Sequence, residues 1–284
     1  MSNKRAAKVR RVNASEVEHY RDNGWAYLPG FLDSDVASEM LKYLEERLGK
    51  DGTRADQPPG AKAILTESDR WRDLRFLARE EHIEPFDSLC FSEAMGENAR
   101  LMMDRDIDVR YDVDGVLLKM PQGEFASGPT GWHQDFPNLS HDRVGYLVFW
   151  FALNDVPPER GSMRFLSGSQ REGPLGRTLR SGLDLVTQYP SLNEKYEMSP
   201  PLDLRAGDAT CHHGLVVHSA PPNSTTTPRW GYGVGYFPND VCYTGAAFAH
   251  TDDLGLSIGS ELDHPNFPLV WTSGSPVNVQ MAAG

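Results

Sequence analysis

Cysteine is scarce in this sequence: Cys90, Cys211 and Cys242 are the only three among 284 residues. An odd number at wide spacing provides neither a disulfide framework nor the paired spacing of a zinc site. The scarcity argues against a small disulfide-stabilised secreted scaffold and favours a reducing compartment. We therefore expect a cytoplasmic protein.

Long hydrophobic runs are also missing. No stretch approaches the roughly 18 apolar residues that suggest a membrane span. The longest run, residues 144–153, is interrupted by Gly145 and predicts a buried strand. The basic start of the chain has no apolar stretch behind it and does not resemble a secretory signal. We expect residues 1–14 to be a disordered basic tail and no membrane to be a partner.

Positive charge is in short supply, because 28 Lys and Arg residues face 40 Asp and Glu residues and give a net charge of −12. A surface of this sign argues against nucleic acid and anionic membranes as partners. It would suit a cationic small molecule, although a negative charge also serves solubility. The sequence gives no indication of the oligomeric state.

The pattern along the chain predicts one domain over residues 15–284, with a helical N-terminal layer to about residue 105 and strands after it. From residue 107 apolar and polar residues alternate with a period of two, which is typical of strands. Many short strands behind a helical layer indicate a mainly β fold with flanking helices and an antiparallel, double-sheet jelly-roll core. Residues 173–201 form a long excursion of unassigned role, and the last 45 or so residues have no clear pattern. The predicted helices cover 15–21, 34–48, 67–81 and 92–103, and the predicted strands cover 25–28, 107–120, 144–153, 163–166, 209–218 and 230–237.

Two histidines and one aspartate carry the chemistry that the sequence suggests. His133 and Asp135 are two residues apart, so in an extended strand both would point to one face. His218, inside a later apolar run, would add a second imidazole. Two histidines and a carboxylate with open positions form the facial arrangement of non-haem Fe(II) oxygenases. Arg229 follows 11 residues after His218, and its planar guanidinium would suit a carboxylate co-substrate.

A second His-x-Asp pattern, His250 and Asp252, shows that the pair alone is a weak signal. Only His264 follows it, and no Lys or Arg follows at all. We therefore interpret His250 and Asp252 as surface-loop residues.

Several segments together resemble the phytanoyl-CoA dioxygenase family of Fe(II)/2-oxoglutarate oxygenases, across roughly residues 15–240. One departure is Gln170, which stands where that family often has a histidine that is not a metal ligand. The segments that carry the resemblance are residues 23–32 (NGWAYLPGFL), 118–121 (LKMP), 132–135 (WHQD), 150–156 (WFALNDV), and 207–218 followed by Pro222, Asn223 and Arg229.

The resemblance implies a double-stranded β-helix with Fe(II) held by His133, Asp135 and His218. It also implies 2-oxoglutarate and O2 as co-substrates, with Arg229 binding the distal carboxylate. Lys119 and Trp150 align with family positions near the co-substrate, and Thr130 could hydrogen-bond it. Each also has a plainer interpretation: Lys119 as a lysine at the rim, Trp150 as a core aromatic residue and Thr130 as a cap of its loop. No residue stands out as a catalytic group beyond the metal ligands, and no substrate-binding residue is identified.

The expected function is a dioxygenase that oxidises a small molecule with release of succinate and CO2. The substrate would be a secondary metabolite in a biosynthetic pathway, such as antibiotic biosynthesis, and a cationic one such as an aminosugar would suit the net charge. Acyl-CoA hydroxylation is the alternative within the family. A non-catalytic ligand- or metal-binding barrel, or a cupin-like metal enzyme without 2-oxoglutarate, are the alternatives outside it, and neither accounts for Arg229. The presence of Asp135 favours hydroxylation or a related oxidation over halogenation, because family halogenases lack this carboxylate.

Overall fold

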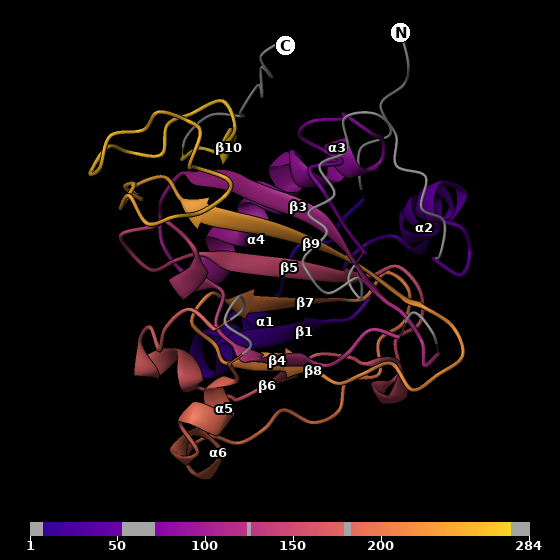
Figure 1. The fold of residues 1–284 in the computed structure, drawn as a ribbon. Coiled ribbons are helices and arrows are strands. Elements are labelled where there is room, and N and C mark those ends of the chain that lie inside the picture. Colours follow the sequence, from indigo (N-terminus) through magenta and orange to yellow (C-terminus); the bar gives the residue numbers. More distant parts are fainter. Residues whose placement is uncertain (1–7, 53–71, 124–125, 179–182, 274–284) are drawn as a thin grey trace, which may run out of the picture.

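Two antiparallel sheets organise the molecule, described here from a computed structural model that covers residues 8–52, 72–123, 126–178 and 183–273 (Figure 1). The large sheet has the strand order β1-β7-β5-β9-β3-β10, with β2 also paired to β3, and the small sheet has the order β4-β8-β6. This arrangement confirms the predicted mainly β, jelly-roll architecture. The strands are β1 (Trp25–Leu28), β2 (Arg72–Arg75), β3 (Val109–Lys119), β4 (Thr130–His133), β5 (Leu147–Ala152), β6 (Arg164–Phe165), β7 (Ala209–His213), β8 (His218–Ala220), β9 (Arg229–Pro238) and β10 (Leu269–Trp271).

Helices cover one face of the large sheet. Figure 1 shows α1 and α4 behind its strands, with α5 and α6 beside the small sheet. The apolar faces of α1 to α4 share one buried cluster with alternate residues of β3, β5, β7 and β9. Stacking of Phe31 on Phe149, with ring centroids 5.4 Å apart, belongs to this layer. The helices are α1 (Ala14–Asn23), α2 (Ser34–Leu48), α3 (Phe86–Cys90), α4 (Glu93–Met103), α5 (Leu185–Gln188) and α6 (Ser191–Lys195), and the 3₁₀ turns are η1 (Phe136–Asn138), η2 (Pro158–Arg160) and η3 (Ser169–Glu172).

The start of the chain is more ordered than the sequence suggests. The cap of α1 is Asn13, whose side chain accepts from the Glu16 N–H while the Glu16 carboxylate accepts from the Asn13 N–H. The sequence Ser15-Glu16-Val17-Glu18 also has the capping-box pattern and predicts a cap at Ser15, two residues later than the cap in the structure. Val12 is buried and its N–H donates to Asn98 in α4, so residues 8–13 pack on the fold although the sequence analysis assigns them to a tail.

The predicted helix over residues 67–81 is wrong where the structure describes it. Residues 72–75 form β2, which pairs antiparallel with Gly115–Leu118 of β3. Residues 67–71 lie outside the described residues. Pairing with a long neighbouring strand overrides the local helical preference, which is a weak determinant of structure.

The predicted strand over residues 209–218 is two strands in two different sheets. β7 belongs to the large sheet, the chain turns at Gly214, and β8 pairs with β4 and β6 in the small sheet. This turn carries His212 and His218 to opposite walls of the barrel interior. The space between the sheets is filled on one side by an apolar cluster that includes Trp25 and Phe165, which stack with ring centroids 5.0 Å apart.

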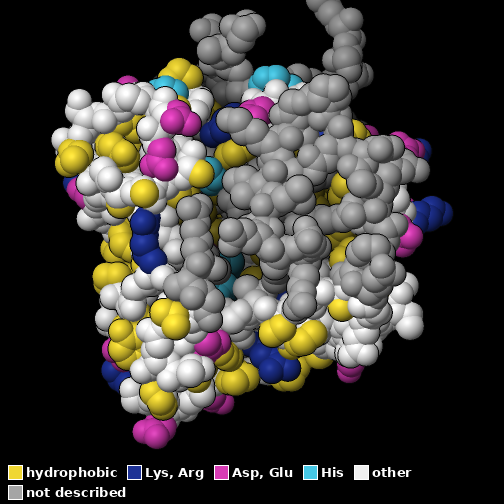
Figure 2. Space-filling view, viewed as in Figure 1, with side chains coloured by type: hydrophobic (Ala, Val, Ile, Leu, Met, Phe, Trp, Pro, Cys, Tyr) yellow, Lys and Arg dark blue, Asp and Glu magenta, His cyan; other side chains and the backbone are white. Residues whose placement is uncertain are grey.

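Charged side chains are scattered over the face seen in Figure 2. Lys and Arg side chains lie there as separate groups among Asp and Glu, apart from the area covered by undescribed residues. Within the described part of the chain, no helix is long and apolar enough to cross a membrane. The three cysteines are free thiols.

Candidate metal centre

His133 and His218 lie side by side on the neighbouring strands β4 and β8 of the small sheet. They are register partners in the β4–β8 pair, and their ring centroids are 4.1 Å apart. His133 Nδ1 lies 2.8 Å from the Gly131 carbonyl oxygen, and His218 Nδ1 lies 3.1 Å from that of Val216. Because a carbonyl only accepts, each Nδ1 carries the proton and each Nε2 keeps a free lone pair. This is the tautomer that a metal-binding histidine requires.

Asp135 meets the two histidines from outside the strand. It lies two residues beyond the end of β4 and caps η1, where the Phe136 N–H donates to the Gly214 carbonyl. Its Oδ1 is 3.5 Å from His133 Nε2 and 3.9 Å from His218 Nε2. The expected convergence is therefore present, but a turn produces it and strand alternation does not.

The protonation states of this group suit a cation. Burial alone would raise the pKa of Asp135, but the neighbouring His218, His133 and His212 outweigh it and hold the pKa well below its usual range. Burial, with the nearby His133, keeps the pKa of His218 well below its usual value. The site thus presents a charged carboxylate and, at His218, a neutral imidazole at neutral pH.

His212 holds the other oxygen of the same carboxylate. Its Nε2 lies 3.0 Å from Asp135 Oδ2, and its side chain is 3% exposed. Since the carboxylate is ionised, the imidazole donates this hydrogen bond. The sequence predicts that His212 and His213 either support the metal ligands or are buried structural histidines, and the turn at Gly214 shows that His212 is the one beside Asp135.

The three predicted metal ligands fit a single ion. His133, Asp135 and His218 each offer one ligand atom, and these atoms lie within 4.8 Å of one another. It is the only such cluster of His, Cys, Asp or Glu among the described residues. Two imidazoles and one carboxylate on one side of a cavity leave the remaining coordination positions for other ligands, as a non-haem Fe(II) site requires.

Two buried basic side chains, which we term the basic pair, lie next to each other on the large sheet. Lys119 of β3 and Arg229 of β9 are register partners, and they are 0% and 3% exposed. Lys119 Nζ donates to the carbonyls of Ala220 and Pro221 at 3.0 and 2.8 Å, and Arg229 Nη1 donates to that of Gly161 at 2.6 Å. Burial and the nearby Arg229 lower the pKa of Lys119 to about 6, and burial lowers that of Arg229 to about 10.

Trp150 and Thr130 contact the basic pair. The guanidinium carbon of Arg229 is 5.1 Å from the Trp150 ring centroid. A Cβ at Gly231 would collide with the Trp150 indole, so only glycine lets the ring lie on β9. Thr130 Oγ1 is 3.4 Å from Lys119 Nζ. The four residues expected near the co-substrate are therefore brought together, and Lys119 is buried where a rim lysine was the plainer interpretation.

The surroundings of the basic pair suit an anion. No carboxylate of the described residues pairs with Arg229, its Nε is buried without a hydrogen-bond partner, and Trp150 Nε1 is in the same state. Burial removes the hydration of the Arg229 guanidinium and favours the neutral form of Lys119, and a bound anion would offset both effects.

The second His-x-Asp pattern differs from its prediction. Asp252 is exposed, as expected of a surface loop, and accepts from the Phe248 N–H at 2.8 Å. His250 is only 7% exposed, so its assignment to the surface is wrong. It packs against Phe248, with ring centroids 4.3 Å apart.

Comparison with known proteins decides the family. The family model for phytanoyl-CoA dioxygenase (PhyH) matches residues 20–231. The chain belongs to the phytanoyl-CoA dioxygenase family. A probable alpha-ketoglutarate-dependent hypophosphite dioxygenase of Stutzerimonas stutzeri is 23% identical over 238 residues, which cover 80% of this chain and 79% of that protein.

Two solved structures from nogalamycin biosynthesis are also similar. The alpha-ketoglutarate-dependent carbocyclase SnoK is 25% identical with a TM-score of 0.73, over 92% of this chain and 97% of that one. The epimerase SnoN, in complex with Fe3+, alpha-ketoglutarate and nogalamycin RO, is 26% identical with a TM-score of 0.70, over 90% and 98%. This member of the PhyH family is thus an Fe(II)- and 2-oxoglutarate-dependent oxygenase that uses O2.

Replacing His212 by phenylalanine is expected to weaken Fe(II) binding about 10- to 100-fold, the usual effect of removing a partner that orients a metal ligand. The ring volume is retained while the donor to Asp135 is lost. Anaerobic Fe(II) titration measures the effect. His213→Gln is the matched control, because His213 Nδ1 accepts from the Leu215 N–H instead. Equal affinity in wild type and His212→Phe would refute the role.

Affinity for 2-oxoglutarate is expected to fall as pH rises above about 6. Below the lowered pKa Lys119 is charged in the free protein, and above it binding of the dianion must also take up a proton. The affinity should therefore decrease by up to about tenfold per pH unit until the higher pKa of the complex is reached. Equilibrium dialysis at several pH values, compared with Lys119→Met, isolates this effect. A wild-type slope no steeper than that of the variant would contradict it.

Proposed function

We propose that this oxygenase hydroxylates or otherwise oxidises a secondary metabolite, with iron held by His133, Asp135 and His218. The observation that carries the proposal is the pairing of two sites inside one barrel. A His-Asp-His group that can hold a metal and the buried basic pair of Lys119 and Arg229 belong to the same barrel. A binding barrel without chemistry would need neither.

Arg229 would bind the distal carboxylate of 2-oxoglutarate, supported by the charge of Lys119 and the hydroxyl of Thr130. Arg229 is fixed by its bond to the Gly161 carbonyl and by Trp150 beneath it, so its fork is already oriented when the co-substrate arrives. Trp150 would form the wall that keeps water from this ion pair. These roles follow from contacts made by the chain's own residues.

Iron and 2-oxoglutarate, when bound, supply an oxidative decarboxylation that consumes O2, releases succinate and CO2, and oxidises a carbon of the substrate. The chain's own residues hold the metal ligands in place. The backbone carbonyls of Gly131 and Val216 fix the two imidazoles, and His212 fixes the carboxylate. The carboxylate of Asp135 supports hydroxylation or a related oxidation over halogenation.

The proposed substrate class is a biosynthetic small molecule with a cationic group, such as an aminosugar. SnoK and SnoN, similar over nine-tenths of this chain, come from nogalamycin biosynthesis, and the net charge of −12 favours a cation.

The test is a screen of natural products with purified enzyme, Fe(II), 2-oxoglutarate and O2, measuring succinate and the mass of the products. Amine-bearing compounds and their N-acetylated forms should be paired. The proposal expects succinate release above the substrate-free rate, matched by oxidised product, with amine-bearing members. Stimulation by acyl-CoA and by no natural product would instead support acyl-CoA hydroxylation.

A further inference from the structure

Three titratable side chains form a second buried group, which we term the Asp112 cluster. Asp112 belongs to β3, His141 to the loop after η1, and His250 to the segment after β9. They are 0%, 6% and 7% exposed. Their ligand atoms do not converge as those of the metal centre do, because the only group within 4.8 Å among the described residues is His133, Asp135 and His218.

Asp112 has an unmet need for hydrogen-bond donors. In the described structure neither carboxylate oxygen has a hydrogen-bond partner, and neither ring nitrogen of His141 has one. The Nδ1 of His250 lies 4.0 Å from Asp112 Oδ1, which is beyond hydrogen-bond distance. By contrast, the equally buried Asp114 accepts from the hydroxyls of Tyr111 and Tyr232 and from the Ala78 N–H. Buried carboxylates without donors are costly, and native proteins rarely retain them without a purpose.

The cations near this end of β3 are committed elsewhere. Arg110 donates to Asn239, to the Phe267 carbonyl and to Asp263. Burial lowers the pKa of His141 to about 4, so its ring is neutral at neutral pH and does not balance the charge of Asp112. A donor-rich positive group from outside the chain would supply both the missing charge and the missing hydrogen bonds.

The position of the cluster relates it to the metal centre. Asp112 is the extra residue where the β3–β9 register shifts between Tyr111 and Val113. One row of partners crosses the sheet from His212 through Val148 and Gly235 to Val113. Three strand spacings of about 4.8 Å place Asp112 about 14 Å along the sheet from His212. A substrate of the size of a glycoside spans this length.

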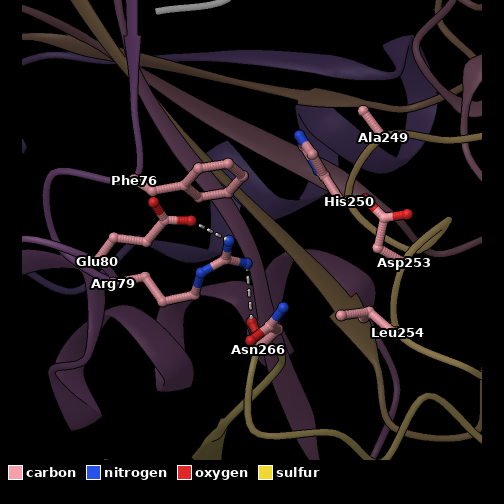
Figure 3. A pocket seen from close by; sticks show the side chains of 8 residues that line it. All are labelled: Phe76, Arg79, Glu80, Ala249, His250, Asp253, Leu254 and Asn266. Carbon is pink, nitrogen blue, oxygen red and sulfur yellow. Dashed lines mark hydrogen bonds and ion pairs between the residues drawn. The ribbon is translucent and has the colours of Figure 1, made fainter. Parts of the chain in front are cut away.

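A pocket and several aromatic rings adjoin the His250 side of the cluster. His250 lines a pocket of about 140 Å³ together with Phe76, Glu80 and Asp253. Figure 3 shows the Phe76 and His250 rings beside each other, with the Arg79 guanidinium carbon 3.8 Å from the centroid of the Phe76 ring, where Arg79 also donates to Asn266 and Glu80. Phe76 and His250 have ring centroids 5.0 Å apart, and His141 lies 4.8 Å from Phe237. Aromatic faces of this kind favour cations.

We propose that the Asp112 cluster binds a protonated nitrogen group of the substrate, an ammonium or guanidinium, with Asp112 as its carboxylate partner and His141 as a neutral hydrogen-bond partner. This inference rests on the proposed function, because the nitrogen group that binds here belongs to the same molecule that the enzyme oxidises. It makes Asp112 the residue that selects cationic substrates.

Binding of small probes tests the site without iron or turnover. Ligand-observed saturation-transfer NMR with methylguanidinium, and with the neutral isostere methylurea, is measured on the full chain and on Asp112→Asn. Methylguanidinium is expected to bind wild type and to lose about tenfold or more in affinity in the variant, as a charge-assisted hydrogen bond is lost. Methylurea should bind both proteins much more weakly than methylguanidinium binds wild type. Equal methylguanidinium affinity in both proteins, or no binding to wild type, would overturn the proposal.

Thermal unfolding of the same variants separates recognition from support of the fold. Asp112→Asn should unfold at the wild-type temperature or above it, because a buried charge without donors is removed. Asp114→Asn, two residues away, should unfold at a lower temperature, because it breaks a satisfied network. A fall for Asp112→Asn as large as that for Asp114→Asn would assign Asp112 to the fold. Since neither measurement uses iron, a failed oxygenase assignment would leave these results unaffected.

Discussion

Asp135→Ala should abolish 2-oxoglutarate turnover and reduce Fe(II) affinity by more than the 10- to 100-fold expected for His212→Phe. The variant removes the only charged ligand atom of the group and leaves His133 and His218 to bind the cation alone. Removing a ligand should cost more than removing the residue that orients it, for which about 10- to 100-fold is typical. Anaerobic Fe(II) titration and succinate release measure the two effects.

Asp252→Ala is the matched control, because it removes the aspartate of the other His-x-Asp pattern. Asp252 bonds to the backbone of its own loop and is absent from the metal-binding group. Its variant should keep wild-type iron affinity. If Asp135→Ala also kept wild-type affinity, the metal would have to bind elsewhere.

Arg229→Ala should raise the KM for 2-oxoglutarate by about 30- to 3,000-fold, while the affinity for Fe(II) alone is retained. Truncating one partner of a buried charge pair typically costs about 2–5 kcal/mol, and each 1.4 kcal/mol corresponds to tenfold. Arg229 is 3% exposed and its hydrogen bonds go to carbonyls, so no described carboxylate loses its partner in the free protein. Steady-state kinetics with varied 2-oxoglutarate measure the change.

An exposed arginine provides the comparison. Arg205 pairs with Asp155 at 3.2 Å on the surface, and its side chain is 70% exposed. Arg205→Ala should leave the KM unchanged, since exposed ion pairs contribute little. A KM for Arg229→Ala equal to that of Arg205→Ala would remove Arg229 from the co-substrate site.

The sequence predicts the members of the site better than it predicts how they meet. His133, His218 and Arg229 are identifiable because residue type and order along the chain limit the alternatives. The reason given for Asp135 fails, because β4 ends at His133 and a turn delivers the carboxylate. The one predicted strand over residues 209–218 likewise hides the turn at Gly214 that separates His212 from His218.

What sequence reasoning misses depends on tertiary contacts. The strand β2 exists because β3 offers it a partner, and Asn13 caps α1 where the serine–glutamate pattern indicates Ser15. The strict alternation of polar residues in β3 suggests one polar face, yet the register shift and the helical layer bury both Asp112 and Asp114. Burial of a polar residue depends on what packs against it, and period-two alternation carries no such information.

Anaerobic addition of 2-oxoglutarate to Fe(II)-loaded protein tests the central claim most directly. Chelation of iron by 2-oxoglutarate in a site with two imidazoles and a carboxylate produces a weak visible metal-to-ligand charge-transfer band. The account predicts this band in wild type, its absence in Asp135→Ala, and its appearance only at much higher 2-oxoglutarate in Arg229→Ala. Iron-loaded wild type without the band at saturating 2-oxoglutarate would contradict the shared site of metal and co-substrate.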